Sequence, residues 1–173
     1  MTLRLALAQI NATVGDLPGN RKKIIEGMQK ARRSGAQVVI FPELAVTGYP
    51  PEDLLLKPDF VEAAQRILTD LVKETKGLVA VIGGLWVEDD LYNGAAVLAD
   101  GRLAGVYAKQ YLPNYGVFDE NRYFQAGKQN QVFRLGDTVF GVSICEDIWY
   151  PNGPPQAQAA QGPQDDRQAG VGI

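Results

Sequence analysis

The 173-residue sequence contains no histidine and a single cysteine, Cys145. Without histidine, the usual zinc constellations are excluded, and so is the usual base for a cysteine nucleophile. One cysteine cannot form an internal disulfide, which suits a reducing compartment such as the cytoplasm. If Cys145 reacts, a carboxylate must take its proton, because the thiolate is the nucleophile.

Strong charge of one sign and long apolar runs are also missing. Seventeen basic and 20 acidic residues give a net charge of −3, so we expect no binding to nucleic acid or to anionic membranes. The N-terminus lacks the pattern of a signal peptide, and no run approaches the ~18 apolar residues of a membrane span. With 46% hydrophobic residues in one domain's length, we expect a soluble, cytoplasmic protein with a substantial core.

Apolar periodicity predicts strands and helices arranged as a mixed α/β sheet covered by helices. The order β-α-β at the start implies a parallel strand pair. The dipeptide Asp100-Gly101 suits a type I′ turn and predicts a hairpin. The expected strands cover residues 3–9 (both faces buried), 38–41, 78–83, 95–98, 103–108, 131–135 and 138–144, and the expected helices end near Ser34 and Gly77.

The composition changes after Tyr150. Residues 151–173 are mostly Gln, Pro, Gly, Ala and Asp, and no helix or strand period is visible in them. We therefore predict a polar, disordered tail.

Three reactive side chains follow or end predicted strands, where α/β sheets form clefts. They are Glu43, Lys109 and Cys145. Each also has an ordinary interpretation: a loop carboxylate, a surface cation, and a cysteine that only fills the core. Together, in a chain without histidine, they describe one workable catalytic site.

The chemistry of such a site can be stated. Glu43, shielded from water, would act as general base toward the Cys145 thiol. Lys109 would stabilise the negative charge of a tetrahedral intermediate, and the backbone N–H of Glu146 would complete the oxyanion hole. The attacked atom would be a carbonyl or nitrile carbon, and the intermediate a thioester that water hydrolyses.

Glu43, Lys109 and Cys145 lie in or next to five sequence segments: Phe41-Pro42-Glu43-Leu44, Thr47 to Leu55, Leu112 to Glu120, Arg122-Tyr123-Phe124 and Ser143 to Trp149. The segments around the three reactive residues resemble the Glu-Lys-Cys triad motifs of the nitrilase, or carbon–nitrogen hydrolase, superfamily. The flanking loops narrow the resemblance to the glutaminase domains of glutamine-dependent NAD⁺ synthetases.

The resemblance implies an α-β-β-α sandwich of nitrilase type that releases ammonia from glutamine. It implies that Glu43 is the base, Lys109 the cation and Cys145 the nucleophile, while Glu120 is a second glutamate that holds the lysine and substrate. Tyr115 lies where the family often places a glutamine-contacting tyrosine. The glutaminase step needs no cofactor or metal; ATP, Mg²⁺ and deamido-NAD⁺ belong to a synthetase domain, and complete members commonly form homo-oligomers.

The resemblance covers residues 1–150, a partial carbon–nitrogen hydrolase domain, and the pyrophosphate loop of a synthetase domain is absent. We therefore expect a truncated or frame-shifted product that lacks the C-terminal part of the fold, exposes a sheet edge and apolar surface, and is inactive or impaired alone. Two alternatives stay open: a stand-alone amidase or nitrilase of the same superfamily, and a non-catalytic remnant.

Overall fold

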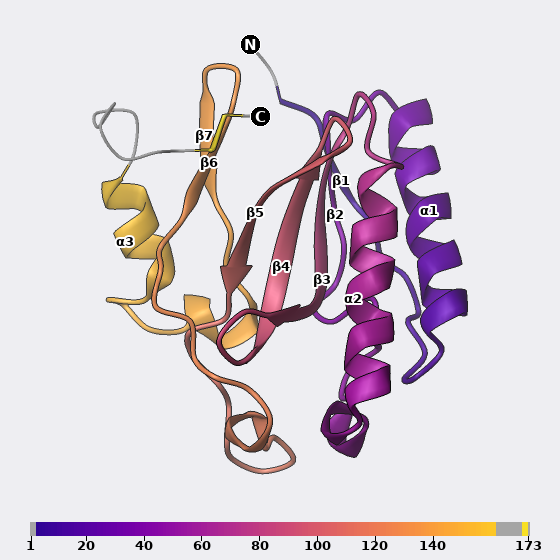
Figure 1. The fold of residues 1–173 in the computed structure, drawn as a ribbon. Helices are drawn as coiled ribbons and strands as arrows, with labels where there is room; N and C mark the ends of the chain where they lie inside the picture. The colour runs from indigo at the N-terminus through magenta and orange to yellow at the C-terminus, as the bar shows by residue number, and fades with distance from the viewer. Residues whose placement is uncertain (1–2, 162–170, 173) are drawn as a thin grey trace.

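The computed structural model describes residues 3–161 and 171–172, and these residues form four layers (Figure 1). Helices α1 (Leu17–Arg33) and α2 (Pro58–Val72) cover one face of a five-stranded sheet. A three-stranded sheet lies against the other face, and helix α3 (Pro154–Ala160) lies outside it. The expected α-β-β-α sandwich is confirmed. Within the described residues, no helix is long and apolar enough to cross a membrane.

The five-stranded sheet combines parallel and antiparallel pairs in the order β1-β2-β3-β4-β5. The first three strands are parallel, as the β-α-β pattern predicts, and the last three form an antiparallel meander. Asp100 (φ 48°) and Gly101 (φ 77°) both have positive φ, as expected for the predicted hairpin turn. The strands are β1 (Leu5–Leu7), β2 (Val38–Ile40), β3 (Val79–Val87), β4 (Leu91–Ala99) and β5 (Arg102–Ala108).

Helix α1 shows how the sequence specifies the outer layer. The Asp16 side chain accepts a hydrogen bond from the Gly19 backbone N–H at 3.0 Å and so caps the first turn. Of the apolar stripe predicted at Ile24, Ile25, Met28 and Ala31, Ile25 is partly buried and the other three are buried, at 0%, 0% and 3% exposure. Each large side chain in such a stripe contributes about 1.5–3 kcal/mol by leaving water.

The second sheet has the order β7-β6-β8 and packs against the face of β3, β4 and β5 through a separate apolar cluster. Tyr107 and Phe133 are the largest side chains of that cluster, and both are fully buried. The strands are β6 (Val132–Leu135), β7 (Thr138–Gly141) and β8 (Val171–Gly172). Strand β7 ends at Gly141, three residues before the predicted end at Ile144.

Strand β1 corrects one expectation, that both of its faces are covered. Leu5 pairs with Val38 and Leu7 with Ile40, so these leucines point toward the same side as the inter-sheet cluster. They are nevertheless 53% and 74% exposed. The second sheet covers the β3–β5 side of this face and leaves the β1 side in solvent, so apolar surface is exposed on β1, a place where the sequence did not predict it.

Helix α3 corrects a second expectation, because the sequence predicted no helix after Tyr150. Pro154 begins the helix, where its missing N–H costs nothing. The buried Gln158 side chain then donates a hydrogen bond to the Val142 carbonyl at 2.6 Å. Apolar periodicity missed this helix because a polar side chain anchors it. The rest of the predicted tail, residues 162–170 and 173, lies outside the described residues.

Candidate active site

Glu43 stands on a tight turn directly after strand β2. Its neighbour Leu44 has a φ of 48°, and the turn packs against Gly83 in strand β3. A Cβ at position 83 would lie 2.3 Å from the Pro42 carbonyl oxygen and 2.5 Å from the Leu44 nitrogen. Only glycine therefore lets the Glu43 turn approach the sheet this closely.

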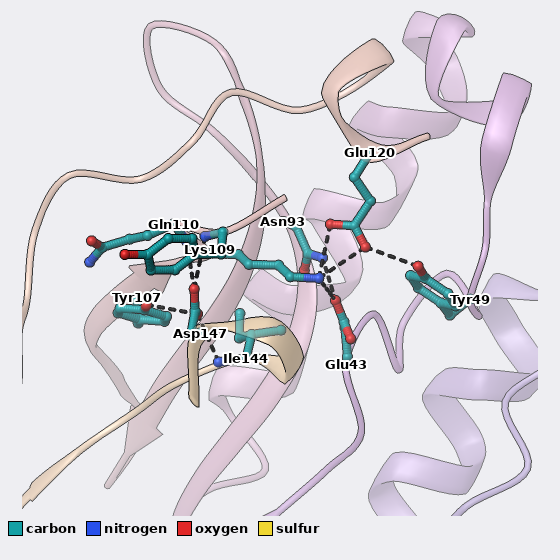
Figure 2. A network of polar contacts seen from close by, with 10 residues as sticks. Glu43, Tyr49, Asn93, Tyr107, Lys109, Gln110, Glu120, Ile144 and Asp147 are labelled. Atoms are coloured by element: carbon teal, nitrogen blue, oxygen red, sulfur yellow. Dashed lines mark hydrogen bonds and ion pairs between the residues drawn. The ribbon is translucent and has the colours of Figure 1, made fainter. Parts of the chain in front are cut away.

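Lys109 follows the last residue of strand β5, and its side chain is fully buried. Its Nζ lies 2.7 Å from Oε1 of Glu43 and 2.9 Å from the carboxylate of Glu120 (Figure 2). The structure thus brings together three residues that lie up to 77 positions apart in the sequence (120 − 43 = 77). Burial of such an ammonium is tolerated because both carboxylates contact it.

Two further side chains hold the carboxylates from outside. Asn93 of strand β4 donates a hydrogen bond to Oε1 of Glu43 at 2.7 Å, and the Tyr49 hydroxyl donates to Glu120 at 2.9 Å (Figure 2). Neither residue was predicted from the sequence to have a role. The available signal at Asn93 was a lone amide in an otherwise apolar and aromatic strand.

Cys145 is exposed, and it begins a short 3-10 helix, Cys145–Ile148. Its φ of 47° lies in the left-handed region, which costs a non-glycine residue about 1–2 kcal/mol. The sharp turn presents the thiol at the surface, beside the buried charges of Glu43 and Lys109. A strained backbone at a reactive side chain is typical of functional sites.

The charges around Cys145 favour its protonated form at rest. Partial burial raises the pKa of the thiol, the negative charge of Glu43 raises it further, and Lys109 and the Glu146 backbone N–H oppose the rise. A protonated thiol needs a base before it can attack, and Glu43 is the carboxylate whose charge acts most strongly on this thiol.

The buried cluster carries more negative than positive charge. Burial lowers the pKa of Lys109, but the ion pairs and hydrogen bonds with Glu43 and Glu120 outweigh this and raise it. Burial raises the pKa of the Glu120 carboxyl, and the proximity of Glu43 adds to the rise while Lys109 opposes it. Two carboxylates around one ammonium leave a net charge near −1, which attracts a cation.

The Glu146 side chain is a feature that the sequence analysis missed, since it singled out only the backbone N–H. The carboxylate is 5% exposed, and one oxygen accepts a hydrogen bond from the Tyr150 hydroxyl at 2.7 Å. The other oxygen, Oε2, is buried without a partner among the described residues. The half-exposed Tyr115 has a raised pKa, through burial and then through the charges of Glu146 and Cys145.

Comparisons with known proteins place this fold and site in one family. The sequence matches the carbon–nitrogen hydrolase family over residues 4–162. The chain therefore belongs to the carbon–nitrogen hydrolase family, which confirms the resemblance seen in the motifs. The match continues beyond residue 150, where the sequence analysis placed the end of the domain, and includes helix α3.

Within that family, the chain is similar to glutamine-dependent NAD(+) synthetases. It is 46% identical to the enzyme of Thermotoga maritima over 154 residues, and this aligned region covers 88% of this chain and 27% of that enzyme. It is 41% identical to the enzyme of Aquifex aeolicus over 162 residues, and this aligned region covers 92% of this chain and 28% of that enzyme. The chain thus spans less than a third of the length of these relatives.

Two solved structures extend the comparison. The glutamine-dependent NAD⁺ synthetase of Acinetobacter baumannii, in complex with ADP, matches with a TM-score of 0.85 and 44% identity, over 92% of this chain and 30% of that one. A glutamate-to-glutamine mutant of the amidase from Nesterenkonia sp. AN1 matches with a TM-score of 0.81 and 26% identity, over 93% and 64%. In that amidase structure, acrylamide has added to the active site cysteine.

Proposed function

We propose that this chain is the glutaminase part of a glutamine-dependent NAD⁺ synthetase, that its reaction is hydrolysis of the side-chain amide of glutamine, and that the chain is impaired or inactive on its own. The observation that carries the proposal is a fully buried Lys109 between the carboxylates of Glu43 and Glu120, beside an exposed thiol on a strained turn. The similarity to curated glutamine-dependent NAD(+) synthetases supports the choice of reaction.

In the proposed first half-reaction, Glu43 takes the proton from the Cys145 sulfur as the sulfur attacks the amide carbon. The carbonyl oxygen becomes an oxyanion, which the Lys109 ammonium and the Glu146 backbone N–H stabilise. When the intermediate collapses, the C–N bond breaks and Glu43 returns its proton to the leaving nitrogen, so ammonia departs. A thioester between Cys145 and the glutamyl carbon remains.

In the second half-reaction, Glu43 takes a proton from a water molecule that attacks the thioester. The same oxyanion forms again, and its collapse breaks the C–S bond. Glutamate leaves, and the proton held by Glu43 returns to the Cys145 sulfur. These steps use three side chains, one backbone N–H and water.

The electrostatics favour glutamine over a simple aliphatic amide. Glutamine carries an α-ammonium group, and the unpartnered Oε2 of Glu146, one residue after the nucleophile, is the acceptor that we propose for it. We propose Tyr115 as a further contact to the substrate, because its ring is half exposed and the resemblance places a glutamine-contacting tyrosine there.

The ammonia would pass to a synthetase domain, which would use ATP and Mg²⁺ to amidate deamido-NAD⁺. That partner domain, association of the complete enzyme into a homo-oligomer, and a cytoplasmic location are parts of this proposal. They follow from the resemblance and the single cysteine.

Covalent labelling tests the proposal. We expect a glutamine-mimicking chloroketone to add once to the chain, as read by intact mass, and Cys145→Ala to abolish the adduct. Glu146→Gln should slow labelling by this reagent at least about tenfold, a loss of about 1.4 kcal/mol, but not labelling by acrylamide, which has no ammonium group. Glu62→Gln, an exposed helix position, is the matched control.

Equal labelling of the wild type and Glu146→Gln by the chloroketone would instead favour the stand-alone amidase. Turnover of small aliphatic amides or nitriles in preference to glutamine would do the same. A folded chain that gains no adduct from either reagent would be a non-catalytic remnant.

A further inference from the structure

Asp147 has no role in the chemistry described above, yet its carboxylate is fully buried two residues after the nucleophile. Each of its oxygens accepts two hydrogen bonds (Figure 2). None of these four partners is a cation; they are three backbone N–H groups and one hydroxyl. A buried carboxylate with this number of donors is fully satisfied, and it fixes the position of every group that donates to it.

The four donors come from two sides of the candidate active site. On the cysteine side, Oδ2 accepts from the Ile144 backbone N–H at 3.0 Å, and Ile144 directly precedes Cys145. On the lysine side, Oδ1 accepts from the backbone N–H groups of Gln110 at 3.1 Å and Tyr111 at 2.9 Å. These two residues directly follow Lys109.

The fourth donor joins the two sides. The hydroxyl of Tyr107 in strand β5 donates to Oδ2 at 2.8 Å, so one oxygen contacts both the strand that carries Lys109 and the turn that carries Cys145. Tyr107 is itself fully buried in the cluster between the sheets. Its ring is therefore fixed, and the hydroxyl provides a rigid reference point for the turn.

We propose that Asp147 is a positioning residue that sets the Cys145 turn at a fixed distance from Lys109 and Glu43. The carboxylate links the backbone on both sides of the site and holds Cys145 in its left-handed conformation by closing the turn on Ile144. This inference rests on the proposed function, since it concerns the geometry of the same site. A displacement of about 1 Å at a reacting atom can cost on the order of a hundredfold in rate.

Hydrogen exchange of the whole chain tests the coupling without any catalytic assay. In Asp147→Asn, one acceptor oxygen becomes an NH₂ donor, so we expect segments 107–111 and 144–149 to exchange faster together. Asp100→Asn is the matched control, because Asp100 also accepts a backbone N–H, that of Gly77 at 2.9 Å, but at the opposite end of strand β5 from Lys109. Faster exchange in only one of the two segments would overturn the proposal.

The pH dependence of Cys145 alkylation by acrylamide provides the second readout. Burial and Glu43 raise the pKa of this thiol above its ordinary value of 9.0, against Lys109, so a displaced turn should move the midpoint back toward that value. Glu43→Gln removes the carboxylate charge directly, so its effect shows the direction in which the alkylation midpoint should move. Tyr107→Phe removes one hydrogen bond to Asp147 without changing any charge, and it should shift the midpoint the same way by a smaller amount.

The outcomes separate this inference from the proposed function. If the alkylation midpoint shifts in Glu43→Gln but stays unchanged in both Asp147→Asn and Tyr107→Phe, the positioning role is refuted. The proposed role of Glu43 as the base is not affected by that outcome. An unchanged midpoint in Glu43→Gln, with both segments still exchanging faster in Asp147→Asn, would refute the proposed base and support the coupling. If Asp147→Asn does not fold, Tyr107→Phe alone decides between these outcomes.

Discussion

Lys109 carries a positive charge at a position with no exposed side-chain surface, and two carboxylates make this possible. Removing the ammonium would leave Glu43 and Glu120 close together, without their cation. Buried pairs of this kind contribute little net stability when complete, but they are costly to break. The stability of the domain and the chemistry of the site therefore depend on the same side chain.

We expect Lys109→Met to lower the free energy of unfolding by about 3–5 kcal/mol, because two largely buried carboxylates lose their partner. Denaturant titration measures the loss. Lys73→Met is the matched control: Lys73 pairs with Asp70 at 3.5 Å, but both side chains are mostly exposed, so its removal should leave the stability nearly unchanged. Equal losses in the two variants would contradict the buried-pair interpretation.

At the residue scale, the reactive side chains that end or follow strands could be predicted from the sequence. The side chains that position them through hydrogen bonds could not. Glu43 and Lys109 stand out because a charge after an apolar strand is unusual. Asn93, Asp147 and the Glu146 side chain make their contacts across 36 to 50 sequence positions or through local turn geometry, which no periodicity reports. Only the fold reveals such partners.

At the scale of secondary-structure elements, the turn after β2 and strand β3 approach each other more closely than any side chain would allow. Gly83 makes this possible, and the next residue, Gly84, offers a comparison. A Cβ at position 84 would meet only the flexible end of the Leu68 side chain, at 3.0 Å. The two neighbouring glycines therefore differ in what surrounds them.

We expect Gly83→Ala to destabilise the chain by about 1–3 kcal/mol, as overpacking against a backbone does, and to displace Glu43. Gly84→Ala should cost less, because Leu68 can change its rotamer. Thermal unfolding measures both, and acrylamide labelling of Cys145 reports whether the site has moved. A larger loss of stability in Gly84→Ala than in Gly83→Ala would show that the Glu43 turn can move away from strand β3.

Helix α3 depends on one side-chain hydrogen bond. Gln158→Ala leaves the Val142 carbonyl without its donor, so we expect a loss of about 1–2 kcal/mol in the free energy of unfolding. Gln156→Ala changes the same residue type at an exposed position of the same helix and should have almost no effect. Circular dichroism during denaturant titration measures the difference, and identical curves would mean that α3 contributes nothing.

The elements predicted well are those with an apolar stripe or a turn signature: α1, the β4–β5 hairpin and α2, although α2 ends at Val72 and not near Gly77. Helix α3 was missed because alanine, glutamine and proline give no apolar period. Strand β1 was found, but its burial was not. Its alternating leucines predict a strand, but whether that strand is covered depends on how far the second sheet extends.

At the scale of the whole molecule, the two sheets differ in extent, and the leucines of β1 stand in solvent as a result. We expect self-association that rises with concentration, because apolar side chains on a strand next to a free edge pair readily with other chains. Leu7→Lys should reduce this association, measured by light scattering, and change the stability by less than about 0.5 kcal/mol. Val117→Lys adds the same charge at a 90% exposed loop position and should leave association unchanged.

The order of strands in the larger sheet also bears on how the site assembles in time. Strands β3, β4 and β5 are joined by short turns, so their pairing closes small loops, whereas β1 and β2 join through parallel contacts between distant segments. We expect the meander to form first and to bring Lys109 next to Asn93 before Glu43 arrives. Until then the ammonium lacks one of its counter-ions and stays hydrated. Docking of β2 would then be the step that dehydrates the lysine, and pulsed hydrogen exchange during refolding would show β4 and β5 protected before β1 and β2.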